Sequence, residues 1–466
     1  MVTALAYLLI LVNGVVSLAA PWIGITIAYL FALMTPQNIW FWAFEGIRPF
    51  FMIVVPALIG FGLAVLFGKV QFRRIATRLN AYLFVMWLFM TLAYYVGPYV
   101  DVVNAYRFFD PTYMFETLQK TFLTYFIATV LIDNDRKLKA AALVMVVTVA
   151  YLTWWTNAQY LFEGQWGRIQ GPRNPDGHGI YADENIFSTV FVVGIPFLYY
   201  LGRYLDSRLL RWAVWAVIPL AWHAIFLTAS RGALVGVAAT LALFVLRSER
   251  KFAGVLAVAA FVGAFVWQAG EVMTERATTI GEYQEDTSAT GRIEAWEAAA
   301  GMMAAHPITG VGFSSFGQAF PSFSNAQPRI AHNTIFQIGA EWGLIALTAY
   351  LLLMFSTLNR LRRNGKQLLR GAQDERAKFL FCLNEATLIG LFGLFTCSMF
   401  LSLEAFELFY YLLFLANAVL LASAAEPVAQ PGTATRARAA PAAWRGAKPQ
   451  PAPLRAATER KGSIGT

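Results

Sequence analysis

Long apolar runs alternate with short polar connections along most of the chain. Each run approaches the roughly 20 residues that a helix needs to cross a bilayer. The runs lack the alternation of apolar and polar positions that marks barrel strands, so they predict transmembrane helices. We place these helices at residues 50–68, 80–97, 115–132, 140–155, 185–202, 210–228, 233–246, 253–269, 334–357, 379–401 and 407–424.

The opening stretch, residues 3–36, holds two shorter apolar runs that are broken at Pro21. They fit either two short helices or one bent helix. The whole pattern therefore predicts an all-α integral membrane protein, a bundle of about 12 or 13 helices over residues 1–424.

Composition supports this prediction. The chain is 58% hydrophobic and only 14% charged, whereas soluble domains carry about 25% charged residues. A net charge of +9 would suit nucleic acid, but most basic residues lie in short loops on one side of the runs, so we expect no nucleic-acid partner. Cys382 and Cys397 both lie in apolar runs, and no disulfide framework or metal site is indicated.

The positions of Lys and Arg orient the bundle, because such residues concentrate in cytoplasmic loops. Five basic loops alternate consistently and are assigned to the cytoplasm: Lys69, Arg73, Arg74 and Arg78; Arg136, Lys137 and Lys139; Arg203, Arg208 and Arg211; Arg247, Arg250 and Lys251; Arg360, Arg362, Arg363, Lys366, Arg370, Arg376 and Lys378. Residues 425–466 are rich in Ala, Pro and Arg, and we expect a disordered cytoplasmic tail.

The opposite face then carries two long loops, residues 156–184 and 270–333, and a tight turn at residues 230–232. A loop of about 60 residues is unusual in a compact bundle, and long loops tend to carry function. Ile293, Trp296, Ala300 and Met303 recur within it at helical spacing. This spacing predicts an amphipathic helix that lies on the membrane surface or caps the bundle.

Arginines on this face need an explanation, because cytoplasmic loops are their usual place. Arg231 lies in the tight turn, Arg292 opens the amphipathic helix, and Arg168 and Arg173 lie in the 156–184 loop. A guanidinium is a planar, permanently charged fork that suits diphosphate oxygens. Several converging on one cavity would form an anion site. The alternative for any one of them is a salt-bridge partner or a cation that reaches the interface.

His332 precedes the helix expected from residue 334 and stands with Asn333 at the outer mouth of the bundle. An imidazole titrates near neutrality and suits general-base catalysis; the alternative is a polar residue that faces lipid headgroups. We expect His306 to be structural and His223 to be a hydrogen-bonded histidine within the bundle. His178 fits either role.

We interpret four acidic residues as structural. Glu341 and Glu385 lie inside apolar runs and need a partner, for which an outer-face Arg is the obvious choice. Asp183 and Glu184 open a helix, where acids suit the helix dipole. Asp176, His178 and Asp183 could form a metal site, although no ligand spacing supports one.

Several of these residues also occur in a recognisable order. Ser230, Arg231, Gly232 and Ala233 head one run, and Gly291, Arg292 and Trp296 follow. His306 and Pro307 lead to Gly310, Val311 and Gly312, and then Ala331, His332, Asn333, Gln337, Glu341 and Gly343 enter the next run. This series resembles the O-antigen ligase and polymerase superfamily of bacterial polysaccharide enzymes over residues 185–360. The front end, with residues 34–38, looks like the branch described as O-glycosylation ligases.

The resemblance implies a metal-independent, inverting glycosyltransferase of the bacterial inner membrane with no cofactor. It implies transfer of a glycan from undecaprenyl diphosphate, at the periplasmic face, to a hydroxyl of lipid A–core or of another lipid-linked glycan. One essential His and two essential Arg of the family match His332, Arg231 and Arg292. The family's other outer-loop arginines match Arg168 or Arg173 loosely, and Asn333 is a candidate substrate-binding residue.

A lipid-linked glycan transporter is the competing class of function. Transporters place ionisable residues at the midplane of several spans and often show internal repeats. The candidates here lie in outer loops, and no repeat is evident in the sequence. The pattern therefore favours an enzyme.

Overall fold

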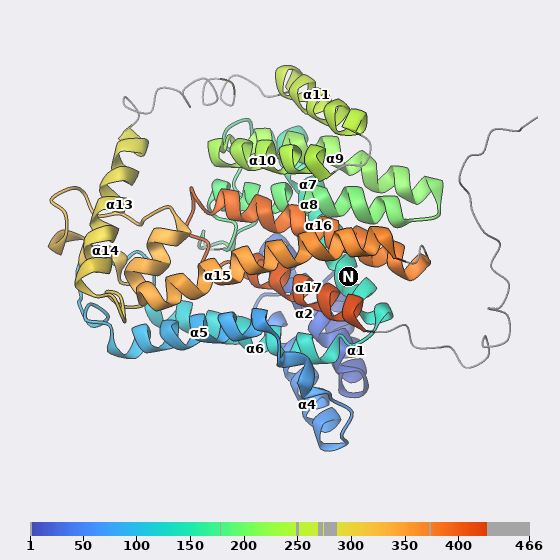
Figure 1. Ribbon diagram of the computed structural model, residues 1–466, viewed down its shortest axis with the longest axis horizontal. Coiled ribbons are helices and arrows are strands. Elements are labelled where there is room, and N and C mark those ends of the chain that lie inside the picture. The colour runs from blue at the N-terminus through green and yellow to red at the C-terminus, as the bar shows by residue number, and fades with distance from the viewer. Residues whose placement is uncertain are drawn as a thin grey trace, which may run out of the picture. The chain divides into compact units, whose positions relative to one another are not determined.

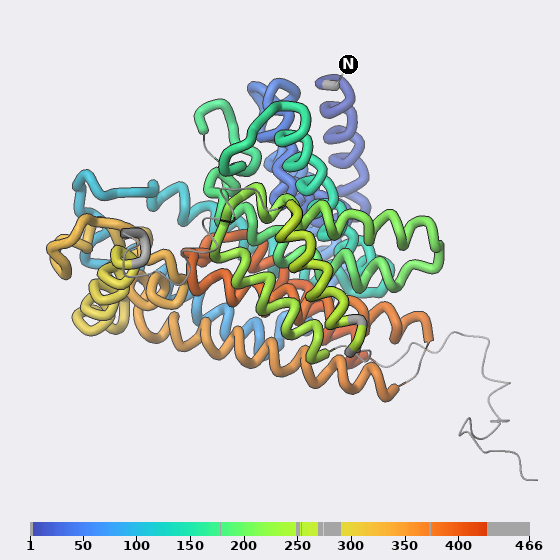
Figure 2. The backbone as a smooth tube through the Cα atoms, turned by 90° about the horizontal axis from the view of Figure 1, so that it is seen from above, coloured from blue at the N-terminus to red at the C-terminus, as the bar shows by residue number. Residues whose placement is uncertain are grey.

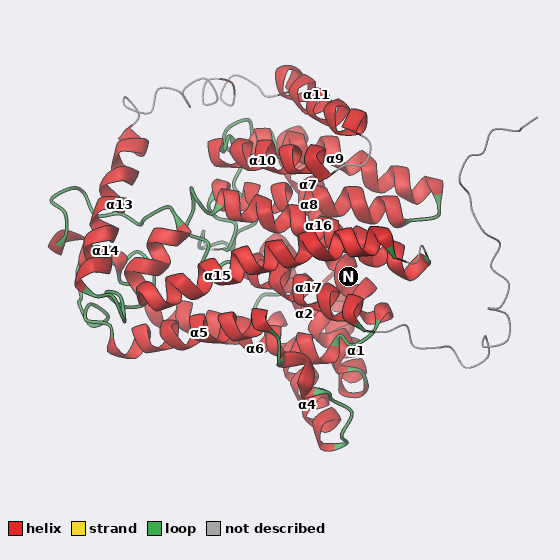
Figure 3. Ribbon diagram, in the orientation of Figure 1, coloured by secondary structure: helices red, strands yellow, loops and turns green. Residues whose placement is uncertain are grey.

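The computed structural model describes residues 2–177, 179–247, 251–268, 274, 287–371 and 374–425. The chain divides into two units, Met1–Ala424 and Ala425–Thr466. The predicted disordered tail lies outside the described residues. Within the described part of the first unit the secondary structure is helical, without strands (Figure 3).

Among the residues that the structure describes, eight helices are long and apolar enough to cross a membrane. They are α4 (Pro49–Leu66), α5 (Arg78–Val96), α7 (Asp135–Leu161), α8 (Glu184–Tyr204), α9 (Arg208–Thr228), α15 (Thr334–Arg370), α16 (Glu375–Cys397) and α17 (Glu407–Ala424). Helices α1 (Val2–Ala19), α2 (Pro21–Met34), α6 (Pro111–Leu131), α10 (Arg231–Arg247) and α11 (Lys251–Gln268) complete the apolar set. The predicted all-α membrane bundle is confirmed, and its opening stretch forms two helices.

Short elements decorate the connections. They are α3 (Pro36–Ile39), α14 (Phe316–Ala319) and the 3₁₀ turns η1 (Phe41–Ala43), η2 (Phe72–Ile75) and η4 (Phe320–Ser322). The amphipathic segment of the large loop forms α13 (Thr287–Ala305).

Helices α8, α16 and α17 form the centre of the bundle, where most of their residues are buried. In Figure 1, α15 and α16 cross the middle, with α8 and α10 on one side and α5 and α6 on the other. Viewed from above in Figure 2, α11 lies over α9 and α10, against which it packs. Small residues permit the closest approaches: a methyl group at Gly194 would lie 2.1 Å from Val149.

One end of the bundle gathers α13, α14, the start of α15 and the loops 97–110, 162–183 and 398–406; we call it the α13 end. Backbone hydrogen bonds join these segments: Tyr99 N to Val311 O (2.9 Å), Ile169 N to Leu227 O (2.9 Å) and Thr334 N to Ser398 O (2.8 Å). The candidate residues with described positions in the outer loops all lie in these segments or at adjoining helix ends.

Helix α15 is broken at Gly343, where φ is 85°. The Leu344 amide, which would bond to Ala340 in an unbroken helix, donates instead to Pro307 O at 2.8 Å. The freed Ala340 carbonyl accepts from Val311 N at 2.8 Å. The break therefore lets the 307–312 segment insert into the helix, and the predicted single span at 334–357 is really a bent helix that continues to Arg370.

Helix α13 forms where the spacing predicted it, but the predicted apolar face was wrong. Ile293 is 42% exposed and Ala300 is also exposed, whereas Ala295, Ala299 and Met302 are fully buried. Alanines make up most of the buried face, which allows α13 to pack closely on the 311–340 region. The larger apolar residues that suggested the face lie at its margin or outside it.

Candidate functional site

His332 has a strained backbone, with φ at +46°. A residue that carries a Cβ disfavours this left-handed region, and such strain tends to persist at functional sites where the surroundings enforce it. The contacts that hold His332 in this conformation involve the residues directly before and after it. They come from α13, from the first turns of α15 and from the 398–403 segment.

Asn333 and Thr334 fix the chain after His332. The Asn333 side chain caps α15 by accepting from Ile335 N (2.9 Å) and Phe336 N (3.3 Å), and its Nδ2 donates to Met399 O (3.1 Å). The Thr334 hydroxyl donates to Leu401 O at 2.8 Å. Asn333, a candidate substrate-binding residue, thus holds the helix start and the 398–403 segment together.

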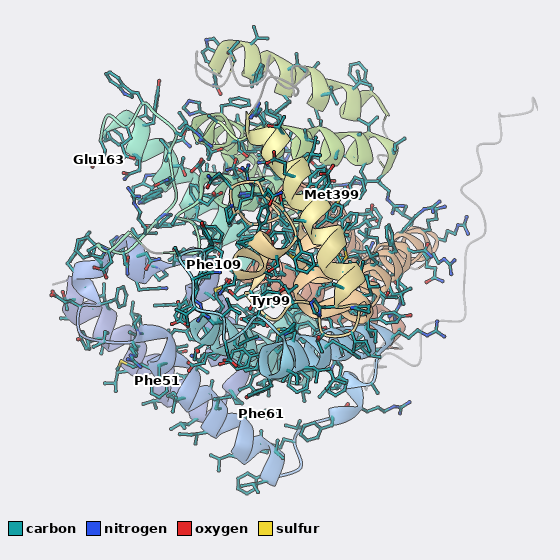
Figure 4. The ribbon with its side chains drawn as sticks, turned by 90° about the vertical axis from the view of Figure 1, so that its left-hand side faces the viewer. Phe51, Phe61, Tyr99, Phe109, Glu163 and Met399 are labelled. Atoms are coloured by element: carbon teal, nitrogen blue, oxygen red, sulfur yellow. The ribbon has the colours of Figure 1, made fainter. Side chains whose placement is uncertain are left out.

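Trp296 fixes the chain before His332. Its Nε1 donates to Ala331 O at 2.9 Å, and its ring stacks on Phe336 with centroids 5.4 Å apart. Arg292 lies one turn earlier on the same side of α13, because positions four apart share a helix face. The Trp296–Ala331 hydrogen bond therefore places Arg292 near His332. Figure 4 looks onto the α13 end, with Tyr99 and Met399 labelled near α13 in this view.

The pKa of His332 reflects the charged groups around it. Burial lowers the pKa of the half-buried imidazole below its ordinary value; the Arg292 cation lowers it further, Asp183 opposes the shift, and Arg329 adds to the lowering. The neutral imidazole, which is the form able to accept a proton, is therefore favoured near neutral pH.

Arg329 is the residue that sequence reasoning missed. Its guanidinium lies directly over Gly291, where a methyl group would come within 1.4 Å of Nη1, and it pairs with Glu294 at 3.6 Å. Gly291 thus makes room for a second arginine beside Arg292. The available signal was the same one that selected Arg292, a basic residue in the large loop, here three positions before the histidine.

Arg231 begins α10 after a left-handed Ala229, whose φ is +50°. Ser230 is fully buried and its hydroxyl accepts from Ala233 N at 3.3 Å. The adjacent Gly232 faces Phe400, with 3.4 Å between an added methyl and the Phe400 Cβ. The Arg231 turn therefore packs on the 398–403 segment, which also anchors Asn333.

The 162–183 loop forms a further side of the candidate site. Arg168 pairs with Glu184 at the start of α8, and Arg173 donates to Gln170 Oε1 at 2.6 Å. Asp183 caps α8 by accepting from Asn185 N (2.8 Å) and Ile186 N (2.9 Å). Asp183 thus has the expected structural role and, in addition, acts on His332. The pairing of Arg168 neutralises part of its charge.

The two buried carboxylates have different partners from those expected. Glu341 accepts from backbone amides and Gln337, so the prediction of an outer-face arginine partner was wrong; the turn at residues 314–316 supplies the donors instead. Glu385 does pair with an arginine, but with Arg247, which the sequence assigned to the cytoplasmic side. This bidentate pair joins α10 to α16, with N–O distances of 2.5 and 2.8 Å.

The other histidines lie apart from this arrangement. His306 packs its ring against Tyr99 (6.0 Å) and Phe323 (6.3 Å), and His223 contacts Asn157 Oδ1 at 2.7 Å within the bundle. His178 lies outside the described residues, and with it the possible metal site. Among the residues that are described, no group of three or more His, Cys, Asp or Glu side chains could hold a metal ion.

The arrangement combines a histidine biased toward its neutral form with arginines from α13 and from the following loop. Such a site can accept a proton from a hydroxyl and stabilise a polyanionic leaving group.

Comparison with known proteins adds one match. Residues 216–351 match the family model described as O-antigen ligase. The matched region runs from α9 into α15 and includes Arg231, Arg292, Arg329 and His332. No curated protein matches the chain significantly. The resemblance inferred from the sequence is confirmed over this region.

Proposed function

We propose that the chain, whose residues 216–351 match the O-antigen ligase family model, is a glycosyltransferase that moves a glycan from undecaprenyl diphosphate to a lipid A–core hydroxyl. The observation that carries this proposal is the clamped, strained His332 with two arginines acting on its charge. The α13 end would face the periplasm, and the multi-pass bundle would lie in the inner membrane.

The arginines would bind the diphosphate. Arg292 lies on α13 and Arg329 in the loop that follows it, and Arg231 lies in the turn whose Gly232 packs against Phe400 of the 398–403 segment. Their forks can each donate paired hydrogen bonds to phosphate oxygens. As the bond between the sugar and the diphosphate breaks, negative charge grows on the leaving oxygen, and preorganised cations stabilise it without a metal.

His332 would act as the general base. The acceptor hydroxyl gives its proton to the neutral imidazole while its oxygen attacks the anomeric carbon and the diphosphate departs. Direct displacement of this kind inverts the anomeric centre. The lowered pKa keeps the base unprotonated near neutral pH, whereas its backbone clamps hold it in place without engaging the ring.

A polysaccharide polymerase or a protein O-glycosylation ligase would use the same donor and the same residues with another acceptor. The transporter alternative is less well supported, because the described candidate residues gather at one end of the bundle and not at its midplane.

The lipopolysaccharide profile of a deletion strain tests this proposal. We expect lipid A–core without attached polymer, restored by the wild-type gene but not by His332→Ala. Core with a single repeat unit would identify a polymerase. An unchanged profile together with loss of glycan from a protein would identify an O-glycosylation ligase, and accumulation of donor on the cytoplasmic side would support a transporter.

A further inference from the structure

Glu341 is a buried carboxylate, 4% exposed, in the α15 segment before the break. Its Oε2 accepts from Ser314 N at 3.0 Å, and its Oε1 accepts from Phe316 N at 3.1 Å and from Gln337 Nε2 at 2.8 Å. The Ser314 and Phe316 partners are backbone N–H groups, which can only donate, so they use both carboxyl oxygens as acceptors. The oxygens of Glu341 therefore require donors from their partners.

This requirement fixes the orientation of the Gln337 amide. Because the NH₂ group faces Glu341, the Oε1 atom faces away, where it accepts from Ala331 N at 3.1 Å and from the Ser402 hydroxyl at 3.0 Å. A reversed amide would set its NH₂ group against the Ala331 N–H, two donors with no acceptor between them. The acceptor oxygen of Glu341 thus helps to hold Gln337 in the orientation that gives the Ala331 N–H its partner.

Ala331 is the residue directly before His332, and its two backbone groups are both held. Its N–H donates to Gln337 and its carbonyl accepts from Trp296. The next residue has the strained φ of +46°. An unfavourable conformation of this kind persists only when surrounding contacts enforce it, and the Gln337 contact is one of these few.

We propose that Glu341 is a positioning residue that orients Gln337 and thereby holds His332 in the conformation needed for proton transfer. This inference rests on the proposed function and adds a mechanism that places the base. It differs from a role in holding the 314–316 turn, which Glu341 contacts through its other hydrogen bonds.

The test compares three purified, full-length variants in transfer from an undecaprenyl-diphosphate-linked glycan. In Glu341→Gln the amide cannot accept from all three donors, so Gln337 can reverse and release Ala331. We expect kcat to fall on the order of 10²-fold, as small misplacements of catalytic groups do, while KM for the donor stays unchanged.

The double variant Glu341→Gln/Gln337→Glu separates the two roles. A carboxylate at 337 again accepts from Ala331 N and can accept from the new amide at 341, whereas the 314–316 turn keeps only part of its hydrogen bonds. We expect the double variant to recover most of the lost kcat. A double variant as slow as Glu341→Gln would overturn the proposal and assign Glu341 to the turn.

Gln337→Met keeps the Glu341 carboxyl group on the 314–316 turn and removes the hydrogen bonds of Gln337 with Ala331, Ser402 and Glu341. It therefore tests the same step if Glu341→Gln does not fold. It should lose kcat with donor KM intact, and wild-type kcat would refute the inference. A wild-type protein that folds but transfers nothing would instead refute the proposed function. Size-exclusion profiles in detergent report folding for every variant.

Discussion

Gly291→Ala is the substitution that most sharply isolates Arg329. An added methyl group would lie 1.4 Å from the Arg329 Nη1 atom, and ordinary contact begins at 3.4 Å, so the guanidinium must withdraw by about 2 Å. The backbone at position 291 can accommodate alanine without strain. Gly291 lies within α13 and does not have a positive φ, and alanine in a helix is about 0.5–1 kcal/mol more stable than glycine.

The cost should therefore fall on transfer and not on stability. A hydrogen bond to a charged group contributes about 1.5–3 kcal/mol, so displacing one guanidinium from the diphosphate should lower kcat/KM by about 10- to 100-fold. The thermal midpoint should stay at or above that of the wild type. Arg329→Gln should show a loss of similar size.

Initial rates with purified protein and a lipid-linked glycan donor measure this effect, and thermal unfolding in the same detergent measures stability. Gly301→Ala is the matched control, because it makes the same substitution in α13 where the nearest atom is a Phe323 ring carbon at 3.2 Å. Wild-type rates in both Gly291→Ala and Arg329→Gln would refute the role of Arg329. A loss in Gly301→Ala equal to that in Gly291→Ala would assign the effect to α13 packing.

Three further predictions follow from the same geometry. Arg231→Lys and Arg292→Lys should each lose most transfer while the protein still folds, because an ammonium cannot form the paired hydrogen bonds of a guanidinium; initial rates measure this. The rate should rise with pH as the His332 imidazole loses its proton, with a midpoint below 6.5, and Arg329→Gln should move that midpoint upward because it removes a cation that lowers the pKa. Gly343→Ala should lower the thermal midpoint, since φ there is 85° and a methyl group would lie 2.2 Å from a carbonyl oxygen, a strain of about 1–3 kcal/mol.

A different result would contradict each of these three predictions. Near-wild-type transfer in both lysine variants would indicate point-charge or structural roles. A rate that is flat across the titration range would remove His332 as the base. For the α15 break, Gly62→Ala is the control, because open space surrounds that position in α4; equal midpoints for the two variants would contradict the strain argument.

The membrane bundle could be predicted because apolar runs of spanning length have few alternatives in lipid. The large loop and its helix α13 were likewise predictable from length and spacing. The face of α13 was not, because Ala295 and Ala299 give little hydrophobic signal, although their small size is what allows tight packing.

The candidate site was partly predictable. Arg231, Arg292 and His332 stood out by type and position, and the contacts that relate them, such as Trp296 to Ala331, join residues 35 positions apart. Arg329 was overlooked because its position depends on the missing side chain at Gly291, a contact between distant segments that no local pattern encodes. The backbone donors of Glu341 were hidden for the same reason, since they become available only when the 307–316 segment inserts at the α15 break.

The most direct test of the account measures donor binding and transfer separately for purified His332→Ala. General-base assistance is worth roughly 10²–10⁴-fold, so transfer should fall by that factor or more, whereas affinity for the undecaprenyl-diphosphate donor should stay close to that of the wild type because the arginines hold the phosphates. His332→Gln should be equally inactive. Retention of most activity by His332→Gln, or loss of donor binding in His332→Ala, would contradict the assignment of His332 as the base of a glycosyl transfer.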